Sequence, residues 1–346
     1  MLFEVVLIRL LLIVLLVLYH SFAIYNGAWE MPEGIIPVEG YWWVASLAYS
    51  FMLEAFVFIS GYVLGFQTKT KYAGVLDFKT CVLKKCRRLM LPSIVFSVLY
   101  FLCFYDASDV SLGEGIYNII NGVGHMWFLP MLFLCFIFIY VVEKFKVSPN
   151  AVLLLSALAA FFSLGPLGDL PFRISSAMYY FLFFASGFYF QKGNISIERF
   201  ARFRNIVFLF VLYVILFVLY NYLCECTKEV GQDVSFYARA FNVLITRIVR
   251  VLQAALGLFT CLTFVKYLIV NGLVKLSSAA IRISGYCFGV YLFQQFILSW
   301  CVDCPVLISA LGPYAFPWVA FLLALGLSLL FTHLLLQTKP GRFLIG

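Results

Sequence analysis

The sequence predicts an all-α fold: a polytopic integral membrane helical bundle with about ten transmembrane helices. Apolar residues make up 64% of the 346 residues and charged residues only 12%, whereas a soluble domain carries about 25% charged residues. Mean hydropathy is +1.02. No polar stretch is long enough to fold as an appended soluble domain, so we expect one membrane domain over residues 1–346.

Ten apolar runs have the length of about 17–25 residues that a transmembrane helix requires. The predicted spans are 5–23, 43–66, 89–105, 126–142, 150–166, 175–191, 205–223, 242–265, 283–301 and 317–337. The first run lacks a basic leading segment and carries its only arginine inside the apolar stretch. We therefore interpret it as a membrane span and not as a cleaved signal peptide.

The connections between these spans alternate in charge. Basic residues follow every second span, at 69–88, 144–146, 192–204, 266–282 and 339–342. Acidic residues dominate the other connections, at 30–39, 106–114, 169, 225–233 and 303. The positive-inside rule therefore predicts that both termini are cytoplasmic, and it accounts for the net charge of +8 without a nucleic-acid partner. Trp29 and Trp42 fit an aromatic belt at the outer interface.

The first predicted span carries an arginine and a histidine on one helix face. Arg9 and His20 are eleven residues apart. At about 100° and about 1.5 Å per residue, their side chains share a face and stand roughly 16 Å apart along the helix axis. An arginine in hydrocarbon costs at least ~2.5–3.5 kcal/mol, so the pair predicts a polar interior. A neutral imidazole beside a hydroxyl is a suitable general base near pH 7.

Charged residues also remain inside other spans. Arg247 and Arg250 lie one turn apart in the eighth span and share a helix face. They have two interpretations: an ion pair with Glu54 that holds helices together, or a site for a phosphate or carboxylate, which the planar guanidinium suits. Glu54 itself either holds an arginine or accepts a proton. Ser60 begins a pair of small residues that lets helices approach closely.

His125 opens the run GHMWFLP at the outer end of the fourth span. Its expected depth is similar to that of His20, so the two imidazoles are candidates to meet, with Trp127 beside them. Histidines, cysteines and carboxylates show no metal-ligand spacing, so we expect no metal site. Four cysteines are predicted on the outer side, where disulfides form, and their pairing stays open: Cys224, Cys226, Cys301 and Cys304.

Six motifs occur in order along the chain. They are Arg9 with His20, FVFISGY ending after Ser60, KKCRRLMLP with Lys85 and Arg88, HMWFL from His125, FFASG and SGYCFGVYL. In this order they resemble the acyltransferase-3 family of integral membrane acyltransferases, which O-acylate sugars of bacterial surface glycans. One position departs from that pattern: family members often carry a histidine where this chain has Gln294, and an amide does not carry a proton at neutral pH.

The resemblance implies a membrane O-acyltransferase of the bacterial inner membrane. It would move an acyl group, with acetyl as the expected one, from cytoplasmic acyl-CoA to a hydroxyl of a surface polysaccharide or lipid-linked sugar, without a bound cofactor. Other expected partners are membrane lipid and polysaccharide-biosynthesis machinery. The candidate site residues are His20 and Arg9 for catalysis, His125, Trp127, Glu54 and Ser60 for support or the acceptor, and Lys85, Arg88, Arg247 and Arg250 for the donor.

A transporter or flippase for a polysaccharide or lipid-linked sugar is the competing function. Ten helices with buried arginines fit it as well, but it predicts an internal repeat with interrupted helices near the membrane midplane. The sequence leaves open the acceptor sugar, the acyl chain, the oligomeric state, and the choice between direct transfer and an acyl-enzyme intermediate.

Overall fold

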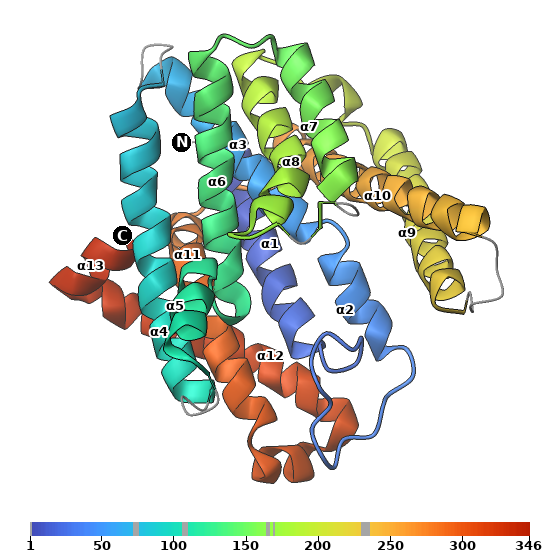
Figure 1. Ribbon diagram of the computed structural model, residues 1–346, viewed down its shortest axis with the longest axis vertical. Coiled ribbons are helices and arrows are strands. Elements are labelled where there is room, and N and C mark those ends of the chain that lie inside the picture. The colour runs from blue at the N-terminus through green and yellow to red at the C-terminus, as the bar shows by residue number, and fades with distance from the viewer. Residues whose placement is uncertain (1, 72–75, 106–109, 164–166, 169, 230–235) are drawn as a thin grey trace.

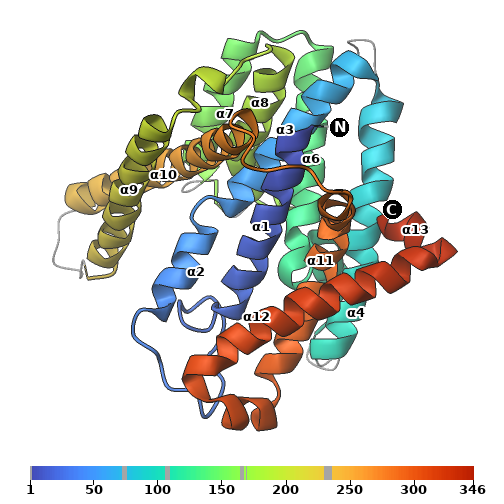
Figure 2. The same cartoon turned by 180° about the vertical axis from the view of Figure 1, so that it is seen from behind.

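The computed structural model describes residues 2–71, 76–105, 110–163, 167–168, 170–229 and 236–346. These residues form helices and contain no β-strand, so the predicted all-α fold is confirmed (Figures 1 and 2). The α-helices are α1 (Phe3–Ser21), α2 (Tyr41–Tyr49), α3 (Met52–Thr70), α4 (Leu91–Phe104), α5 (Leu112–Asn121), α6 (Phe128–Lys144), α7 (Pro149–Ser163), α8 (Ile174–Lys192), α9 (Phe203–Glu229), α10 (Phe236–Val270), α11 (Ser278–Val302), α12 (Pro305–Gln337) and α13 (Lys339–Ile345). Shorter helical turns are η1 (Lys79–Leu83), η2 (Cys86–Met90), η4 (Gly124–Trp127) and η5 (Glu198–Phe200).

Eight helical segments in the described residues are long and apolar enough to cross a membrane. The spans predicted at 150–166 and 175–191 correspond to α7 and α8. α7 has 15 residues, which is short for a span, and α8 is less apolar because neighbouring helices cover it instead of lipid. The count of ten and the cytoplasmic termini stay predictions. Four of the acidic loop residues lie outside the described residues: Asp106, Asp109, Asp169 and Asp233.

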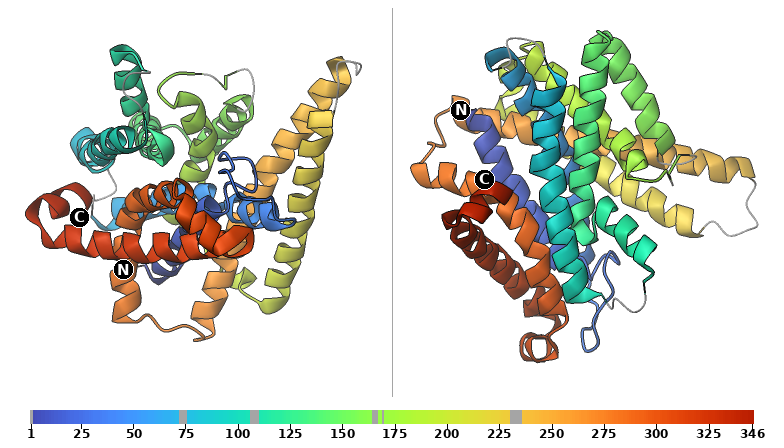
Figure 3. Two further views of the ribbon diagram at one scale, coloured as in Figure 1. Left: turned by 90° about the horizontal axis from the view of Figure 1, so that it is seen from below. Right: turned by 60° about the vertical axis from the view of Figure 1, so that its left-hand side comes forward.

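α1 lies in the middle of the bundle. It packs against α2, α3, α10, α11 and α12, and Figures 1 and 2 show helices on several sides of it. Ile8 and Leu12 on α1 are completely buried. By contrast, α9 packs mainly against α10, and Figure 3 shows this hairpin extending away from the other helices. Arg9 and His20 of α1 are therefore positioned by several elements at once.

Two helical segments are interrupted in the structure, and one of the two breaks lies inside a predicted span. The span expected at 43–66 divides into α2 and α3 because Phe51 has the non-helical angles φ −146° and ψ −5°. α12 breaks at Gly312, where φ is 64° and ψ is 178°. A positive φ of this kind favours glycine, and Pro313 follows it directly. The span predicted at 317–337 lies after this break.

α3 and α8 form the most extensive helix contact. A Cβ on Gly61 of α3 would lie 2.0 Å from the carbonyl oxygen of Phe184, and one on Gly187 of α8 would lie 2.1 Å from that of Phe58. Only glycine allows the two backbones to come this close. The SGY motif of the sequence is thus part of a helix-packing contact.

We expect Gly61→Ala to destabilise the protein, because its methyl group would meet the backbone of α8. Overpacking typically costs about 1–3 kcal/mol. Gly326 in α12 is the matched control: it is also inside a helix, but a Cβ there meets nothing within 4 Å. Thermal unfolding in detergent should give a lower midpoint for Gly61→Ala only. Equal midpoints would show that α3 and α8 do not pack this closely.

Candidate active site

A cavity of about 260 Å³ lies at the end of α1 that carries His20. It is formed by α1, the loop after it, α2, α3, η4, α6 and α11. Most of its wall is apolar or aromatic: Leu16, Tyr19, Ala28, Trp29, Tyr49, Leu53, Trp127, Phe128 and Tyr291. The imidazoles of His20 and His125 and the amide of Gln295 are its polar side chains outside the aromatic wall. Such a cavity, with few polar groups on an apolar wall, is typical of a small-molecule site.

His20 lies in the last turn of α1 and is half-buried. Its Nδ1 atom is 3.1 Å from Oε1 of Gln294 on α11, the residue at which the sequence departs from the family pattern. The ring of Trp29 stacks on the imidazole, with centroids 5.8 Å apart and an angle of 25° between the planes. The loop after α1 brings Trp29 into the cavity wall, and its predicted place in an outer aromatic belt stays a prediction.

His125 lies in η4, directly before α6. Its ring centroid is 6.4 Å from that of His20, so the two imidazoles line the same cavity. Its Nε2 atom is 3.2 Å from the carbonyl oxygen of Leu292. Because a carbonyl only accepts, Nε2 carries the proton and Nδ1 holds the lone pair. Nδ1 has no hydrogen-bond partner among the described residues. The Tyr291 hydroxyl donates to the carbonyl oxygen of His125 at 2.6 Å.

Arg9 lies at the other end of α1, in a basic cluster with two residues that precede α4. Its guanidinium interacts electrostatically with Arg88, and Lys85 interacts with both arginines. In the described part of the chain no carboxylate forms an ion pair with any of the three. Three cations held together without a carboxylate favour binding of an anion with several charges, such as a phosphate.

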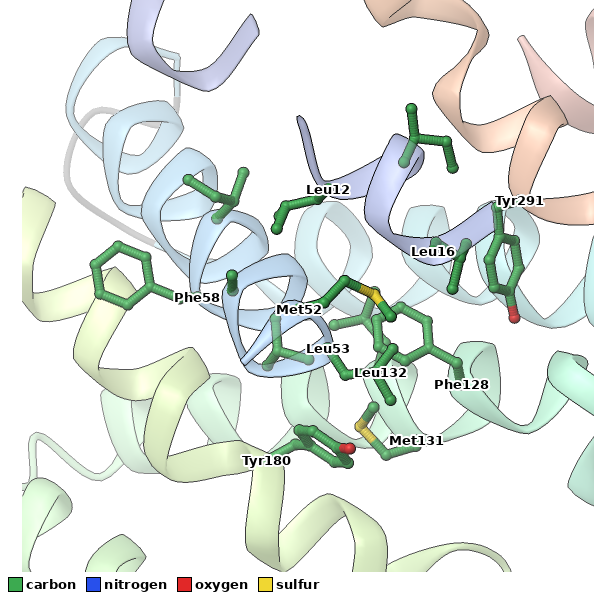
Figure 4. Close-up of a cluster of buried hydrophobic side chains, with 14 of the residues drawn as sticks. Leu12, Leu16, Met52, Leu53, Phe58, Phe128, Met131, Leu132, Tyr180 and Tyr291 are labelled. Atoms are coloured by element: carbon green, nitrogen blue, oxygen red, sulfur yellow. The ribbon is translucent and has the colours of Figure 1, made fainter. Parts of the chain in front are cut away.

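Buried apolar side chains pack together and form an apolar layer beside the histidine cavity (Figure 4). Leu12 and Leu16 come from α1, one and two turns beyond Arg9. Met52 and Leu53 of α3 and side chains of α6 complete the layer: Phe128, Met131 and Leu132. Leu16, Leu53 and Phe128 also line the cavity.

Glu54 and Arg250 form a buried ion pair beside the cavity. Oε1 of Glu54 accepts from Nη2 of Arg250 at 2.7 Å and from the Tyr179 hydroxyl at 2.9 Å. The other arm of Arg250 donates to the carbonyl of Ser50, at the break between α2 and α3. Of the two interpretations given for Arg247 and Arg250, the structure thus shows the ion pair for Arg250. Tyr49, next to the break, lines the cavity.

The four predicted donor-binding residues do not lie together. Lys85 and Arg88 are near Arg9, whereas Arg250 is held at the break between α2 and α3. Arg247 is half-buried one turn away and makes no ion pair with a described residue. The reason is that α10 approaches the bundle at α3, and not at the start of α4.

Two other expected residues have clear positions. Trp127 lines the cavity, and the guanidinium of Arg173 lies 6.0 Å from its ring centroid. Ser60 lies outside the cavity wall, and its hydroxyl donates to the carbonyl of Phe56 in its own helix at 2.9 Å. The sequence analysis missed Gln295, whose only signal was its position one turn after Tyr291 of the last motif. All ten cysteines are free thiols.

We expect Arg250→Gln to destabilise the protein strongly, because it leaves the fully buried carboxylate of Glu54 without its cation. Breaking one side of a buried pair typically costs about 3–5 kcal/mol. The double variant with Glu54→Gln should recover much of this loss. Lys266→Gln, which breaks the more exposed pair with Glu198, should cost about 0–1 kcal/mol. Denaturant unfolding of the wild type, these three variants and Glu54→Gln alone measures these terms, and additive losses of the two single variants in the double variant would exclude the coupling.

Comparison with known proteins gave one family. The family model of the acyltransferase-3 group, described as an acyltransferase domain, matches residues 4–336. No curated protein and no solved structure matched the chain. The match includes Arg9 and His20 of α1, the basic cluster and the residues that line the histidine cavity. Because it covers nearly the whole chain, the protein belongs to the acyltransferase-3 family and is a membrane acyltransferase.

Proposed function

We propose that the protein transfers an acetyl group from cytoplasmic acetyl-CoA to a hydroxyl of a surface polysaccharide or lipid-linked sugar in the bacterial inner membrane. The observation that carries this proposal is the placement of two different chemistries at the two ends of α1. A basic cluster lies around Arg9, and a histidine cavity lies around His20. Membership of the family supports acyl transfer.

The basic cluster suits the donor. CoA carries several phosphates at one end and its thioester at the end of a long, thin pantetheine arm. Arg9, Lys85 and Arg88 would bind the phosphates, and the arm would extend through the apolar layer toward the cavity. The offset of roughly 16 Å between Arg9 and His20 matches a donor that reaches from one face of the membrane toward the other. With both termini cytoplasmic, the nucleotide stays inside.

The histidine cavity suits the acceptor. Aromatic rings such as Trp29 and Trp127 present flat faces with negative potential, against which the C–H groups of a sugar ring pack. His20 takes the proton of the sugar hydroxyl as the oxygen attacks the thioester carbonyl. The new C–O bond forms, the C–S bond breaks, and the proton passes from the imidazolium to the CoA thiolate. In the covalent route the imidazole nitrogen first takes the acyl group, so that a C–N bond forms as the C–S bond breaks. The sugar oxygen then displaces the imidazole, so that the C–O bond forms as the C–N bond breaks.

We expect His20→Gln to lose about 10²–10⁴-fold in acyl transfer, the usual contribution of a side chain that moves a proton in the transition state. Glutamine keeps a hydrogen-bonding group of similar size but takes no proton. His333→Gln is the matched control, because that histidine is exposed near the end of α12. The measurement is transfer of radiolabel from acetyl-CoA to extracted glycans by the purified protein. Near-normal transfer by His20→Gln would show that His20 is not the general base, and His125 would then be the next candidate.

The same assay separates the two function classes. A flippase moves its cargo without cleaving the thioester, so no radiolabel would leave acetyl-CoA in any variant. An acyltransferase releases free CoA in proportion to the label transferred. Absence of both label transfer and CoA release from the wild-type protein, with glycan present, would contradict the proposed function.

We expect Arg88→Ala to raise the KM for acetyl-CoA by about 10-fold, since a hydrogen bond to a charged group contributes about 1.5–3 kcal/mol and Arg88 is partly solvated. The KM for dephosphorylated acetyl-CoA should change less if Arg88 binds the ribose phosphate. Lys84→Ala, an exposed neighbour in the same basic run, serves as the control. Arg247→Ala tests the competing anion site. If Arg88→Ala leaves the KM for acetyl-CoA unchanged, the basic cluster does not bind the donor and only sets the membrane topology.

A further inference from the structure

We propose that Gln294 is a positioning residue for His20, and that its side-chain oxygen selects the imidazole tautomer that presents a lone pair to the cavity. This inference rests on the proposed role of His20 in proton transfer. It concerns a residue that touches no reacting atom, because Gln294 is absent from the cavity wall. Its effect on the reaction passes through His20.

The position of Gln294 is determined by the packing of two helices. α1 and α11 lie side by side and run in the same direction, since Arg9 and His20 of α1 meet, in that order, Cys287 and Gln294 of α11. The Cys287 thiol is 3.7 Å from the carbonyl oxygen of Arg9, and the Gln294 amide is 3.1 Å from His20. Gln294 is completely buried, so its side chain has little freedom to leave this contact.

The chemistry of this contact determines which nitrogen of the His20 ring carries the proton. An amide oxygen accepts hydrogen bonds and never donates them. Its partner, Nδ1 of His20, therefore carries the proton, and Nε2 holds the lone pair. No described residue bonds to Nε2, and the half-buried His20 ring lines the cavity. The stacked Trp29 covers one ring face, which leaves the Nε2 edge for the acceptor hydroxyl.

The same segment of α11 also holds the second histidine. The carbonyl of Leu292 accepts from Nε2 of His125, and the Tyr291 hydroxyl donates to the His125 backbone. Residues 291–294 thus orient both imidazoles of the cavity.

The buried amide of Gln294 lowers the stability of the folded protein, so a variant that removes the amide should still fold. Its Nε2 atom has no hydrogen-bond partner among the described residues, and an unpaired buried group costs about 1–3 kcal/mol. Methionine has nearly the same shape and no such group. We therefore expect Gln294→Met to fold at least as stably as the wild type, so that any loss of activity does not come from unfolding.

The first experiment compares acetyl transfer by three variants. Gln294→Met removes the acceptor, and kcat should fall about 10–100-fold, the range seen when partners that orient functional histidines are removed, with KM for acetyl-CoA unchanged. Gln294→Glu restores an acceptor oxygen in the same place and should recover most of kcat. Gln253→Met, a buried glutamine of α10 that is also incompletely bonded, should behave as wild type. A normal kcat for Gln294→Met would overturn the proposal.

The second experiment does not depend on activity. The chain has only three histidines, so solid-state NMR of protein labelled with ¹⁵N-histidine resolves each ring, with His125→Gln and His333→Gln for assignment. We expect His20 to carry its proton on Nδ1 in the wild type and on both nitrogens, as a mixture of tautomers, in Gln294→Met. A proton on Nε2 in the wild type would overturn the proposal. If the wild type transfers no acetyl group, the proposed function fails, and the NMR result still decides the role of Gln294.

Discussion

α1 is an apolar helix that contains the guanidinium of Arg9 and the imidazole of His20. The packing of the bundle depends on keeping both groups away from lipid. Either group facing lipid would be costly, so α1 lies among α2, α3, α10, α11 and α12. The neighbouring helices then differ at its two ends. The turns before α4 bring cations to Arg9, and α11 brings an amide to His20. The chemistry at each end follows from which helix covers it.

The break between α2 and α3 is the second constraint on the cavity. A broken helix leaves carbonyl groups without their usual partners, and inside a membrane they need another donor. Arg250 donates both to the Ser50 carbonyl and to Glu54. One side chain thus supplies a hydrogen bond to a carbonyl at the break and also neutralises the Glu54 carboxylate. Ser50 also bonds to Tyr213 of α9. The wall that contains Tyr49 is thereby held by three other helices.

The apolar layer beside the cavity consists of side chains that pack closely. The layer contains Met52 and Met131, whose unbranched side chains adapt readily to new neighbours. For the proposed donor, this composition would suit a path that opens for the thin pantetheine arm.

The sequence alone determined the fold class, the approximate position of the eight helical segments that can span a membrane, and the shared face of Arg9 and His20, because hydropathy and the helical repeat are local properties. The similar depth of His125 also followed from its place in a span. Tertiary structure decided the rest. It paired Arg250 with Glu54, away from Lys85. It stacked the ring of Trp29 on that of His20, and it placed the side-chain oxygen of Gln294 beside Nδ1 of His20. These outcomes depend on which helices become neighbours, and contacts between residues up to 274 positions apart leave no trace in local periodicity.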